Sequence, residues 1–124
     1  MAAAYIPNGN SYFANVTAGS YFTANISSTT PTNQWLVTSI SGGPVVFKFS
    51  SNLAKSTLSP NVAAGASGSY EGVVLNPTTG TNQIVGLENG DTSDGSLFVS
   101  TVRFVAIAPT TSYISITPIV PRGA

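Results

Sequence analysis

Residues 33–50 read NQWLVTSISGGPVVFKFS, two apolar-rich stretches on either side of a Gly-Gly pair. Their apolar positions are mostly Val, Ile and aromatic residues, which favour strands over helices. A two-residue Gly-Gly connection is typical of a β-hairpin. The stretch therefore predicts an antiparallel hairpin that places Leu36 opposite Phe49 on one apolar face, with Trp35 on the other face beside Lys48.

The same period of two recurs along the chain, and Gly or Pro interrupts every stretch long enough for three helical turns. Strands are expected near residues 11–17, 20–27, 33–40, 44–50, 69–75, 82–87, 96–108 and 112–120. We predict an all-β fold, a two-sheet antiparallel β-sandwich with the jelly roll as one form, and an open Greek-key barrel as the alternative. The expected domain covers 11–117, between an extended N-terminal arm (1–10) and an extended C-terminal tail (118–124).

Residues 11–27, SYFANVTAGSYFTANIS, contain one short motif twice. In each copy the small and branched residues share one face, so Phe13 and Tyr21 point away from it. A loop around Gly19, with glycine supplying a positive φ, would join the copies as antiparallel neighbours in one sheet. The alternative is that the two strands lie in different sheets.

Charge is scarce, because only 6% of the 124 residues are Asp, Glu, Lys or Arg and the net charge is zero. The cations Lys48, Lys55, Arg103 and Arg122 are scattered singly, which disfavours nucleic-acid binding. No apolar stretch is long enough to span a membrane, and the N-terminus lacks a secretory pattern, so we expect synthesis in a cytoplasm without membrane insertion.

Catalytic chemistry is not indicated. The chain has no His and no Cys, which excludes the Ser-His-Asp triad and thiolate nucleophiles. We predict no enzymatic activity, no catalytic residue and no cofactor. The loop ENGDTSDG (88–95) places Glu88, Asp91 and Asp94 close together, but its spacing does not match an EF-hand, so a solvated loop is expected and a weak calcium site is the alternative.

Three stretches, NQWLVTSISGGPVVFKFSSN, NVAAGASGSYEGVVLNP and NQIVGLENGDTSDGSLFVSTVRF, give residues 33–104 a general layout of apolar strands, a small-residue turn and a Gly-Asp-rich loop. This layout resembles small all-β accessory proteins of tailed bacteriophage virions. The resemblance implies a capsid decoration or cement subunit that binds the major capsid protein or another virion protein. It also implies a location in the virion and a homo-oligomer, as a dimer or trimer, without catalysis.

The scarcity of charge removes the usual protection of sheet edges, so we expect the working state to be an assembly. The candidate contact residues are aromatic or terminal positions: Tyr5, Ile6, Phe13, Tyr21, Trp35, Pro118, Ile119, Val120 and Pro121. Two other functions fit the same composition: a glycan-binding module of a tail or surface appendage, and a self-assembling tail or pilus subunit.

Overall fold

The computed structural model describes residues 5–58, 72–75, 82–88 and 97–121, and these residues form strands, turns and loops without a helix. The strands are β1 (Tyr5–Pro7), β2 (Tyr12–Val16), β3 (Phe22–Thr32), β4 (Gln34–Ser41), β5 (Val45–Ser50), β6 (Val73–Leu75), β7 (Asn82–Val85), β8 (Val99–Ile107) and β9 (Ser112–Pro121). The all-β prediction is confirmed.

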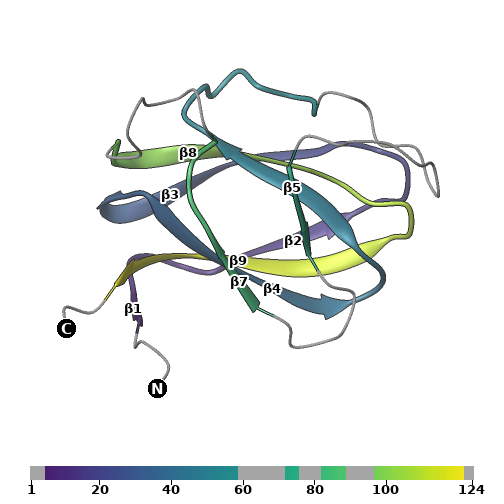
Figure 1. The fold of residues 1–124 in the computed structure, drawn as a ribbon, viewed down its shortest axis with the longest axis horizontal. Helices are drawn as coiled ribbons and strands as arrows, with labels where there is room; N and C mark the ends of the chain where they lie inside the picture. Colours follow the sequence, from purple (N-terminus) through teal and green to yellow (C-terminus); the bar gives the residue numbers. More distant parts are fainter. Residues whose placement is uncertain (1–4, 59–71, 76–81, 89–96, 122–124) are drawn as a thin grey trace.

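The strands form two antiparallel sheets that pack face to face. Sheet I has the order β1-β9-β4-β7, with β2 also paired to β9, and sheet II has the order β3-β8-β5-β6. Figure 1 shows the two layers, with β3, β5 and β8 above β2, β4, β7 and β9. The predicted two-sheet sandwich is therefore confirmed.

The pairing order defines the arrangement of the sandwich. β2 pairs with β9, β3 with β8, β4 with β7 and β5 with β6, so the first half of the chain pairs with the second half in reverse order. These four pairs form one long antiparallel ribbon of two chain segments. The further pairs β4–β9 and β5–β8 fold the ribbon into two layers. This is the jelly-roll arrangement, and the open Greek-key barrel is not formed.

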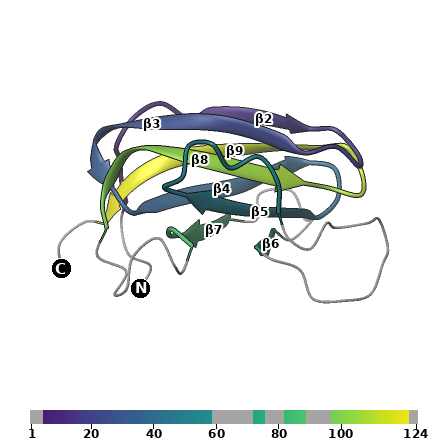
Figure 2. The ribbon, with the colours of Figure 1, turned by 90° about the horizontal axis from the view of Figure 1, so that it is seen from above.

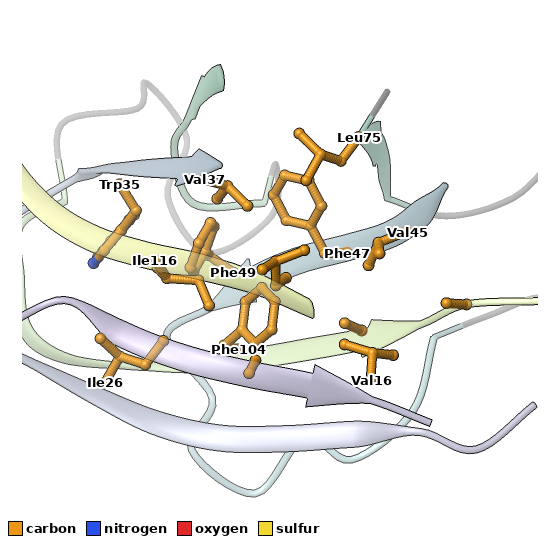
Figure 3. Packing of buried hydrophobic residues seen from close by; sticks show 14 of the residues in the cluster. Val16, Ile26, Trp35, Val37, Val45, Phe47, Phe49, Leu75, Phe104 and Ile116 are labelled. Carbon is orange, nitrogen blue, oxygen red and sulfur yellow. The ribbon is translucent and has the colours of Figure 1, made fainter. Parts of the chain in front are cut away.

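The core between the sheets is aromatic. Trp35 stacks on Phe49 with ring centroids 4.8 Å apart, and Phe104 lies against Phe47 and Phe49 at 6.0 and 5.3 Å. Figure 3 shows these rings surrounded by aliphatic side chains from both sheets. Each large side chain buried in this way contributes roughly 1.5–3 kcal/mol to folding.

The hairpin predicted for residues 33–50 is wrong, because β4 belongs to sheet I and β5 to sheet II. Gly42 has a φ of +94°, and a Cβ there would lie 2.6 Å from the Cα of Ser112. The Ser112 hydroxyl also donates to the carbonyl of Gly43 and accepts from its N–H, each at 3.1 Å. The Gly-Gly pair thus carries the chain from one sheet to the other, held against the start of β9.

This connection reverses the predicted face of β4. Trp35 and Val37 point into the core, whereas Leu36 and Ile40 are half-buried on the outer side of sheet I. Inward and outward residues alternate along β4 with a period of two, as predicted for a strand. The prediction of which of its two faces is buried was wrong.

The two copies of the repeated motif form β2 and β3, which lie in different sheets, so the predicted pairing of the copies within one sheet is wrong and the alternative is confirmed. Figure 2 shows both strands along one side of the sandwich, so each copy is an edge strand of its own sheet. Gly19 between them has the predicted positive φ, +74°. Phe13 and Tyr21 both lie outside the main core, as expected.

Parts of the segments predicted as terminal arms are strands, whereas residues 8–10 are not. Residues 5–7 pair with 119–121, and residues 118–121 form the end of β9. Ile119 is buried and pairs with Gln34 of β4. Residues 5–7 and 118–121 are thus built into sheet I, while residues 1–4 and 122–124 lie outside the described residues.

Asn8 joins the two sheets directly after β1. Its side chain donates to the carbonyl of Thr30 at 2.8 Å and accepts from the N–H and hydroxyl of Thr30 at 3.1 and 3.0 Å. Its backbone bonds Pro118 at 2.8 Å and Thr29 at 2.7 Å. A buried polar side chain that is satisfied in this way fixes where β3 of sheet II crosses β9 of sheet I.

Candidate functional site

The charged residues that the structure describes, Lys48, Lys55, Glu88 and Arg103, gather on the outer side of sheet II. Lys48 comes from β5 and Arg103 from β8, while Glu88 follows β7 and Lys55 lies after β5. Glu88 forms an ion pair with Lys48, and both of its oxygens accept from Nζ of Lys55, at 3.2 and 3.3 Å.

The carboxyl group of Glu88 is held in its charged form. Partial burial raises its pKa, but hydrogen bonds from Lys48, Lys55 and Ser50, with the charge of Lys48, outweigh that effect and leave the pKa below its ordinary value. The ionised carboxylate therefore stabilises the fold at neutral pH.

Residues 51–58, here called the strap, lie over the outer side of sheet II (Figure 1). Leu58, only 3% exposed, packs into a second small core with Val46, Val105 and Ile107. The hydroxyl of Tyr21 donates to the carbonyl of Leu58 at 3.1 Å. The strap is thus fastened to the sheet by an apolar anchor at one end.

Arg103 and Glu88 fasten the middle of the strap. Nε of Arg103 donates to the carbonyl of Lys55 at 2.8 Å, and Nη1 donates to Oδ1 of Asn25 at 3.1 Å. Glu88 binds the side chain of Lys55 as well. The charged cluster therefore holds the strap on the sheet.

One of the three residues of the predicted weak calcium site, Glu88, belongs to this charged cluster. Glu88 is committed to two lysines, and Asp91 and Asp94 lie outside the described residues. Within the described ranges, no three His, Cys, Asp or Glu residues come together in a way that would hold a metal ion.

The outer side of sheet I has a different character and is here called the open face. The pairing registers place on it Phe13, Asn15, Leu36, Thr38, Asn82, Ile84, Tyr113, Ser115 and Thr117. None of these side chains is charged. Phe13, 56% exposed, stacks on Tyr113 with ring centroids 5.8 Å apart and an interplanar angle of 20°.

Neutral hydrogen bonds engage three of the polar side chains of the open face, one of them through Ser11 beside it. The hydroxyls of Ser11 and Thr117 are 2.7 Å apart, and the hydroxyl of Thr38 donates to Oδ1 of Asn82 at 2.8 Å. Groups that are already paired lose little when water is removed from them. The open face is consequently well suited to being covered by another protein.

The predicted contact residues fall into three environments. Tyr5, Ile6 and Phe13 are exposed, and Tyr21 is half-buried against the strap. Trp35 is 1% exposed and lies in the core, where its Nε1 has no hydrogen-bond partner among the described residues. The structure therefore removes Trp35 from the candidate surface.

The predicted contact residues near the C-terminus belong to β9 of sheet I. Pro118 and Ile119 are buried, Val120 is half-buried, and Pro121 ends β9. Tyr113 and Ile84, which are not among the predicted contact residues, are exposed on the open face. In the sequence, Tyr113, Ser115 and Thr117 alternate with isoleucines. This alternation predicts that Tyr113 is exposed once it is known that the isoleucines face the core.

None of the described residues belongs to a helix long and apolar enough to cross a membrane. Comparison of the chain with protein-family models, with curated proteins and with solved structures gave no match. The resemblance to phage accessory proteins stays a prediction.

Proposed function

We propose that this protein is a non-enzymatic structural subunit of a virion, a capsid cement or decoration protein that binds the major capsid protein lattice. The observation that carries the proposal is the open face, whose described residues carry no charged side chain and expose Phe13, Tyr113 and Ile84. Charged residues are depleted and aromatic residues enriched in the cores of protein interfaces.

The chemistry of the open face also defines its partner. A charged group buried against it would find no counter-charge, so the partner surface must itself be neutral and rich in apolar or hydroxyl groups. A capsid lattice repeats such a surface many times. Each contact on it is weak, and linked contacts on one particle reinforce each other.

The virion setting is supported by two things. The layout of residues 33–104 resembles phage accessory proteins, and the jelly roll is an architecture found in viral capsid proteins as well as in lectins. Because one fold serves many functions, the fold alone does not decide between these classes. The extent and neutrality of the open face favour a protein lattice as the partner.

Co-sedimentation with particles tests the proposal. Virions carrying this protein, banded on a density gradient, should contain it at a fixed copy number per particle. Adding purified protein to stripped particles should restore that number. Phe13→Lys, which places a charge at the centre of the contact, should lower occupancy at least about tenfold, equivalent to a loss of about 1.4 kcal/mol.

Leu53→Lys is the matched control, because Leu53 is an exposed leucine of the strap on the opposite side of the molecule. It should leave occupancy unchanged. Equal occupancy for both variants would rule out the open face as the docking surface, and absence of the protein from banded particles would rule out the proposed function.

Glycan binding is the second candidate, because the exposed Phe13–Tyr113 pair lies beside the neutral amide of Asn15. A glycan array read with wild-type protein and with Phe13→Ala distinguishes the two: a sugar bound only by the wild type, without particle binding, would favour this candidate. Filaments of the purified protein in electron micrographs would instead favour a self-assembling tail or pilus subunit.

A further inference from the structure

The free edge of sheet II is formed by β3, the longest of the described strands. Among the described strands β3 pairs only with β8, residue by residue from Phe22 opposite Ala106 to Ser27 opposite Thr101. Figure 2 shows β3 on the side of the sandwich away from β6 and β7. Asn8 bonds Thr29 and Thr30 near the far end of the strand, so the backbone groups that remain as a template for another strand are those of residues 22–26.

This edge lacks the devices that normally prevent strand addition. Natural sheets protect their edges with charged side chains, proline, bulges or very short strands. Residues 22–27, Phe-Thr-Ala-Asn-Ile-Ser, contain no charge and no proline, and the irregularity of β3 begins only after Ser27. By contrast, β6 at the other edge of the same sheet has three residues.

We propose that β3 pairs antiparallel with β3 of a second copy of this chain across a two-fold axis at Ala24, which joins the two sheets II into one continuous sheet. In this register Phe22 opposes Ile26 of the second copy, and Thr23 opposes Asn25 of the second copy. Each pair occurs twice, because an isologous interface repeats every contact.

The register follows from the side chains. Residues on the inner face must oppose inner-face residues, since a shift by one residue would turn apolar side chains to solvent. Oδ1 of Asn25 already accepts from Arg103, which leaves its Nδ2 as a donor for the hydroxyl of Thr23 of the second copy in the proposed register. With Asn25 on the axis instead, two such amides would oppose each other.

The pairing has a consequence for docking. A two-fold axis between antiparallel strands is perpendicular to the sheet, so both copies present their open faces to the same side. A dimer that binds one particle with two open faces gains about 10²-fold or more over a single contact. This gain rests on the proposed function, whereas the pairing of β3 strands does not.

Engineered cysteines test the register, because the chain has no native Cys. The double variant Thr23→Cys/Asn25→Cys places two cysteine pairs directly across the axis, at a separation that a disulfide can span. After oxidation it should migrate at twice the 12.6 kDa mass of the chain on a non-reducing gel. The two single variants, whose cysteines are offset along the strands, should remain uncrosslinked.

A double variant that stays monomeric after oxidation would overturn the proposal, and efficient crosslinking of Asn25→Cys alone would overturn the register. Sedimentation equilibrium gives an independent measurement. Wild-type protein should sediment as a dimer, and Thr23→Lys should sediment as a folded monomer whose cooperative unfolding transition no longer depends on protein concentration. Val74→Lys, at a 54% exposed position on the opposite edge strand of sheet II, should remain a dimer.

A wild-type protein that sediments as a monomer up to high concentration would also overturn the pairing. The two proposals fail separately: a monomer that still binds particles retains the docking function, and a crosslinked dimer that binds no particle retains the pairing.

Discussion

The two outer sides of the sandwich are built by the same strand alternation but are completed differently. On sheet II the apolar side chains Val46, Val105 and Ile107 are covered by the strap, which Glu88 and Arg103 hold in place. On sheet I, Phe13, Tyr113 and Ile84 remain exposed on a face where no described residue is charged.

The difference shows how a chain with few charges uses them. The described charged side chains pair with each other or bond the backbone, and these contacts hold the strap against sheet II. They are not spread over the surface as solvated charges. Ion pairs that are partly shielded from water are screened less by salt than fully exposed pairs. The face from which they are absent is the one suited to a neutral partner.

The largest effect is expected where the strap is anchored. Leu58→Ala removes the apolar contact with the outer side of sheet II and should lower the free energy of unfolding by about 2–4 kcal/mol, measured by urea denaturation. Leu53→Ala, at the 45% exposed leucine of the same strap, should change it by less than about 0.5 kcal/mol. Equal effects would mean that the strap does not cover the sheet.

The charged cluster should have the next largest effect. Glu88→Gln removes the charge that binds Lys48 and Lys55 and should cost about 1–2 kcal/mol at neutral pH. The pKa of Glu88 is lower in the folded protein than in the unfolded chain. Its contribution is therefore complete above the ordinary value of 4.5 and is lost as the pH falls through the folded pKa.

Chemical denaturation at a series of pH values checks this dependence. Wild-type protein should lose stability between neutral pH and the acid range, and Glu88→Gln should lose less over the same interval because its amide does not titrate. Parallel curves for the two proteins would contradict the assigned role of Glu88.

The open face should contribute less to folding than to binding. Phe13→Ser removes the exposed stack with Tyr113 and should cost only about 0.5–1 kcal/mol of stability, while particle occupancy falls at least about tenfold. Thermal unfolding and co-sedimentation of the same preparation measure the two effects together. A large loss of stability would show that the ring pair is a structural contact.

The smallest effect is expected from salt. Docking through a face without charge should change less than about twofold in affinity between about 0.1 and about 1 M NaCl, because there is no ion pair to screen. Binding of labelled protein to particles at several salt concentrations measures it. A steep decrease with salt would point to charged contacts outside the open face.

The strand pattern was readable from the chain because period two is a local property. The stretches around Trp35 and Phe47 alternate clearly, and the repeat predicted the buried faces of β2 and β3 correctly. Gly19 has the predicted positive φ, although the hairpin from which it was predicted does not form.

Strand pairing was less readable, because Gly42-Gly43 suits a hairpin within one sheet and also a passage between two sheets. The choice depends on Ser112, which is distant in sequence and clamps Gly43 only after the chain has folded. Trp35 was assigned to the wrong face for the same reason, since β4 carries apolar residues on both of its faces.

The strap and the open face were the features that the sequence predicted least well. Residues 51–58 have no period, so nothing local indicates that Leu58 is buried while Leu53 is exposed. Their environments depend on Val105 and Ile107, which lie far along the chain.

By itself, the amino-acid sequence determined that the protein is built of strands, that charge is scarce, and that imidazole and thiol chemistry is absent, because composition and local alternation are properties of the chain alone. Only the tertiary structure decided which strands are neighbours, which face of β4 is buried, and which sheet surface stays uncovered. Those outcomes depend on contacts between distant segments, where alternating strands offer several registers and packing of both sheets around Phe47, Phe49 and Phe104 selects one.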